Sequence, residues 1–266
     1  MRWTEKLCTP PGAVHFAENT MNTWAPTNRS KPRGSFYTWA AVGIFLVVFA
    51  GFARTYYLKA LFGTRTLPLL LHLHGLIFTL WFTLFFVQVR LVARHRVDLH
   101  RRMGIIGVVL APLAAGVAIA VSFHAGRRSY LANPGSLAMN LRPLALDFGS
   151  SLTFVVLVAA GLYLRRRGDI HKRMMVLASC SLLLPAVGRF LELIPLRFLL
   201  AGGLWEMVAF TEVTPIVCIV YDTVKHRRLH PAFAWGGLGL LSSLPSFMVI
   251  GNTQTWLHFT TWLLSK

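Results

Sequence analysis

Long apolar runs alternate with short polar segments along this chain of 266 residues. A helix that crosses the hydrocarbon core of a bilayer needs about 20 predominantly apolar residues. Seven stretches meet this requirement, at residues 36–57, 67–91, 103–124, 143–164, 173–194, 197–221 and 232–250. The pattern therefore predicts an all-α fold, a polytopic membrane bundle of about seven transmembrane helices within residues 35–250.

The two ends of the chain differ from the apolar runs. Residues 1–34 are polar, rich in Pro, Thr and Asn, and lack helical periodicity, which is typical of a disordered arm. Met21 is an alternative translation start to Met1. Residues 251–266 are too short to span a bilayer and contain Trp256 and Trp262, whose rings favour the membrane–water interface. We expect a cytoplasmic N-terminal arm and an interfacial C-terminal segment.

The composition and the placement of charge support a membrane location. Hydrophobic residues make up 55% of the chain and charged residues 14%, against about 25% charged in soluble domains. The net charge is +18, and the Lys and Arg residues cluster in the short segments between apolar runs. With the N-terminus inside, 18 of the 27 basic residues lie on the inner side. This bias predicts a cell-membrane protein with a cytoplasmic N-terminus and an external C-terminus, which contacts anionic lipid headgroups and no nucleic acid.

Several common kinds of site find no support in the sequence. The three cysteines, Cys8, Cys180 and Cys218, are odd in number and form no CxxC pair, so neither a disulfide framework nor a zinc site is indicated. The chain also lacks GxGxxG, P-loop, HExxH and GxSxG motifs. Nucleotide-dependent and nucleophilic catalysis therefore have no sequence support.

A polar connector occurs twice. Residues 96–103 (RVDLHRRM) recur 71 positions later as residues 167–174 (RGDIHKRM), with five identities. Each copy joins two apolar runs on the same expected side of the membrane. The sequence thus predicts a parallel internal repeat of a helix pair, with units near 67–124 and 143–194, an arrangement found in transporter folds.

The repeated connector has two interpretations. In one, Asp98 and Asp169 cap the following helices, and nearby basic residues hold lipid phosphates, namely Arg101, Arg102, Lys172 and Arg173. In the other, His100 and His171 lie at matched depth on two helices and form a ligand pair for haem or a metal. The adjacent Arg and Lys residues disfavour a bare cation and suit haem propionates.

A second group of polar residues falls in the outer third of the expected bundle. Its members are His72, His74, Asp147, Arg189, Glu192 and Glu206, with His124 near the rim. Ionisable groups within a membrane cost several kcal/mol unless they are paired or hydrated. The group is therefore either a hydrated binding pocket or a structural salt-bridge network in which Arg189 pairs with Asp147 or Glu206. In a convergent site Arg189 is the natural hub, since its planar donors can bond two carboxylates at once.

His72 and His74 cannot both face one centre, because two residues subtend about 200° around a helix. His74 precedes Gly75, which would allow a flat cofactor or another helix to approach closely. His74 is therefore the better haem or metal ligand, with His124 as one possible second ligand. The alternative is a histidine that is only hydrogen-bonded.

Four stretches carry a resemblance to known sequences, at residues 49–57, 71–75, 96–104 and 230–237. Over most of residues 36–262 the chain resembles a widespread, uncharacterised family of bacterial multi-pass integral membrane proteins, which implies the location but transfers no activity. The segment His100–Gly104 also has a fainter likeness to membrane cytochromes of the b type. The second copy of the connector departs from that pattern at Met175, where a glycine would stand.

Three functional hypotheses follow. The first is haem-b or redox-linked electron transfer, with haem held by His74 and His124 or by His100 and His171. The second is a small-solute or proton-coupled transporter or binding protein whose site contains Asp147, Arg189, Glu206 and His74. The third is a membrane-organising subunit without chemistry. The sequence alone leaves all three open.

Overall fold

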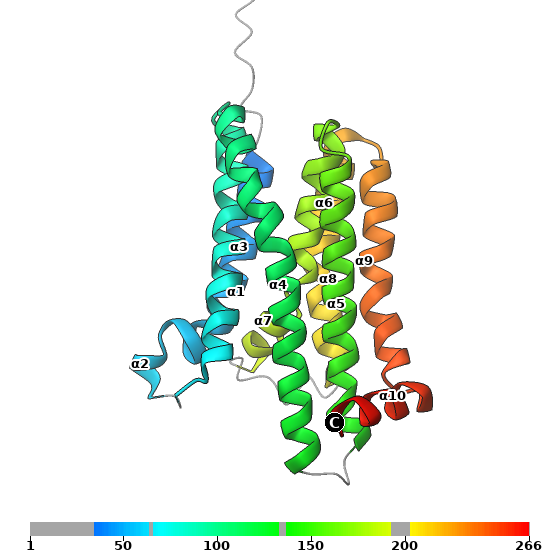
Figure 1. The fold of residues 1–266 in the computed structure, drawn as a ribbon. Coiled ribbons are helices and arrows are strands. Elements are labelled where there is room, and N and C mark those ends of the chain that lie inside the picture. The colour runs from blue at the N-terminus through cyan, green and yellow to red at the C-terminus, as the bar shows by residue number, and fades with distance from the viewer. Residues whose placement is uncertain (1–34, 64–65, 133–136, 193–202, 266) are drawn as a thin grey trace, which may run out of the picture. The chain divides into compact units, whose positions relative to one another are not determined.

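The computed structural model describes residues 35–63, 66–132, 137–192 and 203–265. Every element in these residues is a helix, so the all-α prediction is confirmed (Figure 1). The helices are α1 (Ser35–Phe52), the π-helical η1 (Ala53–Tyr57), α2 (Lys59–Phe62), α3 (Leu69–Ala93), α4 (Val97–Ala132), α5 (Leu137–Tyr163), α6 (Gly168–Ser181), α7 (Leu184–Leu191), α8 (Leu204–His226), α9 (Pro231–Ile250) and α10 (Gln254–Leu264). The predicted arm at residues 1–34 lies outside the described residues.

Six of the described helices are long and apolar enough to cross a membrane, and α6 and α7 together make a seventh candidate. The fifth predicted span, 173–194, is therefore a broken helix, since α6 and α7 are bent by 47° at their junction. The sixth, predicted at 197–221, begins at Leu204 within the described residues. α4 has 36 residues, or about 54 Å at 1.5 Å each, so it extends well past a hydrocarbon core of about 30 Å.

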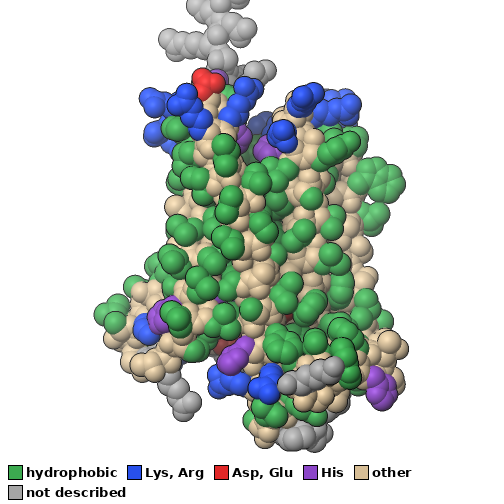
Figure 2. Space-filling view, viewed as in Figure 1, with side chains coloured by type: hydrophobic (Ala, Val, Ile, Leu, Met, Phe, Trp, Pro, Cys, Tyr) green, Lys and Arg blue, Asp and Glu red, His purple; other side chains and the backbone are tan. Residues whose placement is uncertain are grey.

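The helices pack mainly with their neighbours in sequence. α3 packs against α1 and α4, α5 packs against α4, α6 and α9, and the broken pair packs against α1 and α8. Large side chains such as Trp81, Phe154 and Phe233 fill the core. Apolar side chains also cover much of the outer surface, and Figure 2 shows them between ends that carry Lys and Arg. A surface of this kind is suited to lipid, so the chain is a multi-pass membrane protein.

The two copies of the connector lie at the same end of the bundle, which we call the basic end (Figure 1). The connectors between α3 and α4, between α5 and α6 and between α8 and α9 all lie there. The capping interpretation needs a correction, because α4 begins at Val97 and α6 at Gly168. Asp98 and Asp169 thus lie inside the first turns, where the helix dipole favours an acidic side chain. The repeat is also imperfect, since α4 is continuous and its counterpart is broken.

The C-terminal segment forms α10 at the opposite end of the bundle (Figure 1). Thr253 caps this helix by accepting a hydrogen bond from the Trp256 amide at 3.2 Å. The Trp256 indole then donates to the Leu141 carbonyl at 3.2 Å, which attaches α10 to α5. An amphipathic indole suits this position at the predicted interface.

Candidate functional site at the basic end

A buried ion pair joins α6 to α8 near the basic end. Arg173 is 3% exposed and Asp222 is 1% exposed. The Arg173 Nε donates to Asp222 Oδ2 at 3.0 Å, and Nη2 lies 2.9 Å from Oδ1 and 2.7 Å from Oδ2. This bidentate geometry makes charge-assisted hydrogen bonds at both ends of the carboxylate. The pair therefore fixes the rotation of α6 relative to α8.

Further contacts extend the pair to α1 and α9. The Tyr37 hydroxyl of α1 donates to Asp222 Oδ1 at 3.0 Å. The Arg173 guanidinium lies 5.6 Å from the ring centre of Phe233, and Lys172 Nζ lies 4.9 Å from that of Tyr37. Side chains from four helices thus meet at this ion pair.

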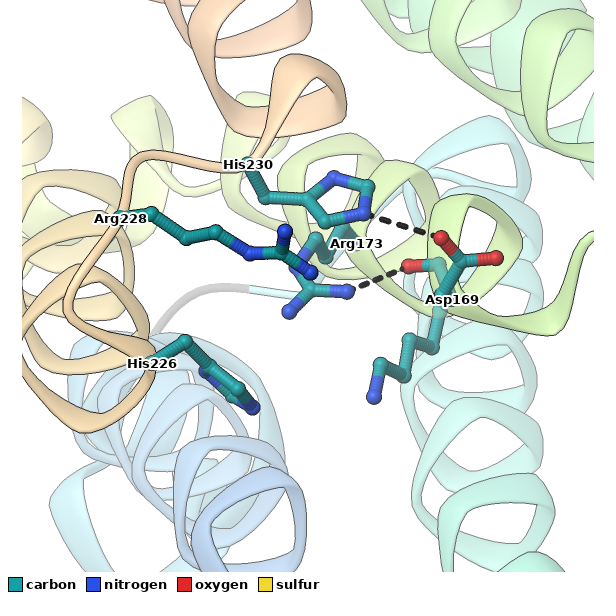
Figure 3. A pocket seen from close by; sticks show the side chains of 6 residues that line it. Asp169, Arg173, His226, Arg228 and His230 are labelled. Atoms are coloured by element: carbon teal, nitrogen blue, oxygen red, sulfur yellow. Dashed lines mark hydrogen bonds and ion pairs between the residues drawn. The ribbon is translucent and has the colours of Figure 1, made fainter.

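A pocket of about 170 Å³ opens beside this pair (Figure 3). Its lining comes from α6, from the end of α8 and from the connector to α9, namely Asp169, Lys172, Arg173, His226, Arg228 and His230. His230 Nε2 lies 2.9 Å from Asp169 Oδ2, while its Nδ1 accepts from the Ala232 amide at 3.1 Å. The connector therefore holds His230 over the first turn of α6 by bonds at both ring nitrogens.

The charges of this pocket favour an anion. Its lining has three basic side chains, one carboxylate and two histidines, and because Asp222 neutralises Arg173 the excess positive charge comes from Lys172 and Arg228. Asp169 is engaged by His230, and Arg173 also donates through Nη1 to the Asp169 carbonyl at 2.8 Å. A guanidinium has five N–H donors, and these bonds leave an Nη1 hydrogen for a ligand. Lys172 and Arg228 are exposed and supply further donors.

The two histidines of the repeated connector also come together. The His100 and His171 rings have centres 6.1 Å apart and an interplanar angle of 80°. His171 Nδ1 lies 2.8 Å from the Gly161 carbonyl, which requires that nitrogen to be the donor. His171 Nε2, which has no hydrogen bond within the described residues, can then accept or ligate. The buried His100 Nδ1 has no hydrogen-bond partner among the described residues.

The predicted outer group is only partly assembled at the opposite end. Arg189 interacts electrostatically with Asp147, Glu192 and His74. It forms no direct ion pair within the described residues; its Nη1 donates to the Pro185 carbonyl at 3.2 Å, and its guanidinium lies 4.7 Å from the Phe52 ring centre. Asp147 Oδ2 instead accepts from Ser122 Oγ at 2.6 Å.

Glu206 and Glu192 do not join Arg189 through hydrogen bonds. Glu206 is half-buried near the start of α8, and Glu192 is exposed at the end of α7. Neither side chain makes a hydrogen bond or an ion pair in the part of the chain that the structure describes. Arg189 therefore does not act there as a hub between two carboxylates.

The histidines predicted on the outer side differ in their surroundings. His72 and His124 are exposed, whereas the His74 ring stacks on Phe78 with centres 4.2 Å apart. Gly75 admits a side chain rather than a cofactor, since a Cβ at this position would overlap the Tyr56 ring. Among the described residues, no group of three or more His, Cys, Asp or Glu side chains could hold a metal ion.

The four basic residues predicted to hold lipid phosphates differ in their exposure. Arg101, Arg102 and Lys172 are exposed and available to lipid phosphates, whereas the Arg173 guanidinium is buried against Asp222. Sequence reasoning missed several residues of the basic end: Tyr37, Asp222, His226, Arg228 and His230. Asp222 gave one usable signal, because it is an acidic residue at the end of an apolar run in a chain with nine acidic residues.

Comparison of this chain with protein-family models, curated proteins and solved structures finds no match in any of the three.

Proposed function

We propose that this membrane protein binds a phosphate-bearing anion, either an anionic lipid headgroup or a soluble phosphate compound, in the pocket at its basic end. The observation that carries the proposal is the lining itself: exposed Lys172 and Arg228 lie beside Arg173, which is paired with Asp222, and beside one carboxylate, Asp169, that His230 engages. Arg is well suited to phosphate because its planar donors match two oxygens at once. The bias of basic residues would place this pocket on the cytoplasmic side of the cell membrane.

The volume and the position suit this ligand. About 170 Å³ is room for several waters at about 30 Å³ each, or for one phosphate group and its nearest hydration. The pocket lies between the start of α6 and the connector from α8 to α9, at the level expected for headgroups. A binding protein or a transporter for a small anion would both use such a site.

The test measures anion binding by purified protein in detergent or nanodiscs. Native mass spectrometry compares phosphatidylglycerol with phosphatidylcholine, and the ³¹P line width of inorganic phosphate reports a soluble ligand. Arg228→Gln and Lys172→Gln should each weaken binding about tenfold, which corresponds to a loss of about 1.4 kcal/mol of binding free energy. Arg165→Gln is the matched control, an exposed basic residue at the same end that lines no part of this pocket.

The two measurements distinguish a lipid phosphate from a soluble phosphate compound. Preferential retention of phosphatidylglycerol assigns the site to lipid, and broadening of the inorganic phosphate line assigns it to a soluble compound. The proposal fails if neither anion binds, or if the three variants bind equally well.

A second candidate function is electron transfer through a haem b iron held by His100 and His171. The specific observation is the juxtaposition of these rings, 6.1 Å between centres, with His171 Nδ1 engaged by the Gly161 carbonyl. Such a carbonyl contact commonly orients a metal-ligating histidine. Haem would supply one-electron chemistry. A Soret band in the purified protein that disappears in His171→Ala supports this candidate, and a colourless protein after haemin addition contradicts it.

A further inference from the structure

A buried carboxyl group lies in the middle third of α8, far from the basic-end pocket. Glu212 is the ninth residue of this 23-residue helix, so it lies about 12 Å along the axis from Leu204 and about 21 Å from His226 at 1.5 Å per residue. Its side chain is 8% exposed, and its Oε1 is buried without a hydrogen-bond partner among the described residues. An uncompensated carboxylate at such a depth is costly.

The backbone is interrupted beside this carboxyl. α6 ends at Ser181 and α7 begins at Leu184, with a 47° bend between them, and both helices pack against α8. The Cys180 carbonyl accepts from the Leu183 amide at 3.1 Å, whereas the residue four positions after Ser181 is Pro185, which has no amide hydrogen to donate to the Ser181 carbonyl. Glu212 interacts electrostatically with Cys180 in the last turn of α6, and its helix α8 contacts α7 on the other side of the break.

Two more polar groups, one on each helix, lack their usual partners among the described residues. Pro215 in α8 has no amide hydrogen, so it cannot bond the carbonyl of Thr211, the residue before Glu212. The Ser179 hydroxyl of α6 is fully buried and makes no hydrogen bond within the described residues. Both helices thus carry oxygen atoms whose usual donors are missing, and oxygen atoms are the ligands of hard cations.

No fixed cation compensates Glu212 in the described part of the chain. None of the described ion pairs contains it. α9 has no ionisable side chain, and α7 has one, Arg189, whose electrostatic partners are Asp147, Glu192 and His74. On α6 the nearest titratable group is the Cys180 thiol, and the basic residues of that helix lie at its other end, where Arg173 is paired with Asp222.

We propose that Glu212 and the interrupted backbone between α6 and α7 form a binding site for a monovalent cation, either a proton or a sodium ion. Broken helices whose freed carbonyls lie beside a mid-membrane acidic side chain bind Na⁺ or H⁺ in transporters. A mobile cation on Glu212 neutralises it without a permanent partner, which makes the occupancy reversible. The site rests on observations separate from the anion pocket, and its test does not depend on anion binding.

The experiment is infrared difference spectroscopy of the full chain in lipid, titrated with pH first in choline chloride and then in sodium chloride. The carboxyl band of Glu212 is identified by its loss in Glu212→Gln. Glu206→Gln is the matched control, because Glu206 is an acidic residue of the same helix and is half-buried. We expect the band to convert from the protonated to the ionised form as the pH rises, and this conversion to persist in Glu206→Gln.

The comparison of sodium chloride with choline chloride shows whether the bound ion is Na⁺ or a proton. If sodium chloride moves the conversion to lower pH relative to choline chloride, the ion is Na⁺; if the two salts give one curve, the ion is the proton. A band that does not change with pH in either salt overturns the proposal, as does a spectrum of Glu212→Gln that is identical to that of the unmodified protein.

A second measurement needs no variant and so remains decisive if Glu212→Gln fails to fold. Dicyclohexylcarbodiimide reacts with protonated carboxyl groups in apolar surroundings, and peptide mapping locates the label. We expect Glu212 to be labelled several-fold more at low pH than at high pH. Equal labelling across the pH range, or labelling of other carboxyls alone, contradicts a reversible cation site.

Discussion

Arg173 and Asp222, which are 49 positions apart in the sequence, form a bidentate ion pair with their closest atoms 2.7 Å apart. Both side chains are almost fully buried, so neither can be solvated if its partner is removed. The pair links the broken helix α6 to α8, and its Arg173 also lines the proposed anion pocket. The packing of α6 against α8 and the shape of the candidate site therefore depend on the same ion pair.

Asp222→Asn should strongly destabilise the protein, because it leaves the Arg173 charge buried without a counter-ion. Breaking a buried pair from one side costs about 3–5 kcal/mol. The double variant Arg173→Met/Asp222→Leu should recover most of this loss, since apolar replacements need no solvation. Denaturation midpoints in detergent measure both effects. Asp98→Asn, an exposed change at the same end, should lower the midpoint only slightly, since it removes about 0.3–1 kcal/mol of interaction with the helix dipole, and an equal loss there would refute the explanation.

Tyr37→Phe tests the contribution of α1 to the same carboxylate. The change removes one hydrogen bond to Asp222 Oδ1 and keeps the ring. A hydrogen bond to a charged group is worth about 1.5–3 kcal/mol. We expect the denaturation midpoint to fall in Tyr37→Phe and to stay constant in Tyr163→Phe, whose side chain is 86% exposed. Similar midpoints for both variants would mean that the hydroxyl contributes nothing.

Gly51→Ala should destabilise the contact between α1 and α7. A Cβ at Gly51 would overlap the backbone of Ala186, which cannot rotate away as a side chain could. Overpacking costs about 1–3 kcal/mol or more. Gly43→Ala on the same helix has nothing within 4 Å of the new Cβ and should gain about 0.5–1 kcal/mol from reduced backbone entropy. We expect the denaturation midpoint to fall in Gly51→Ala and to rise in Gly43→Ala.

Arg189→Leu should lower stability at the opposite end of the bundle. The change removes the cation that interacts with Asp147 and Glu192 and its contact with the Phe52 ring. Arg54→Leu, an exposed change in the π-helical turn η1, is the control. If the two variants unfold at the same denaturant concentration, the electrostatic role of Arg189 is excluded.

The orientation of the chain can be read with reporter fusions in a bacterial host. Alkaline phosphatase is active only outside the cytoplasm, so a fusion after Lys266 should be active and a fusion after Arg228 inactive. The reason is the excess of Lys and Arg in the connectors of the basic end. The reverse pattern of activity would place the anion pocket outside the cell.

The number of apolar helices and the position of the basic connectors were predictable, because hydropathy and charge are properties of local composition. A run of about 20 apolar residues specifies a helix long enough to span a bilayer whatever its neighbours are. The break between Ser181 and Leu184 had a local signal in Pro185, yet its 47° bend depends on how α1 and α8 pack against the two halves. The repeated connector correctly indicated that His100 and His171 share one end of the bundle.

The side-chain partnerships depended on tertiary structure. Arg173 carries the same charge as Lys172, and only the rotation of α6 buries the first against Asp222 and leaves the second exposed. Likewise, depth along a helix placed Arg189 and Glu206 at one level, but depth does not determine which way each side chain points. The sequence by itself determined the spans and the charge at each end, because these are sums over neighbouring residues. The three-dimensional packing decided which charges meet, because that requires the azimuth of each helix, a quantity set by contacts between distant segments.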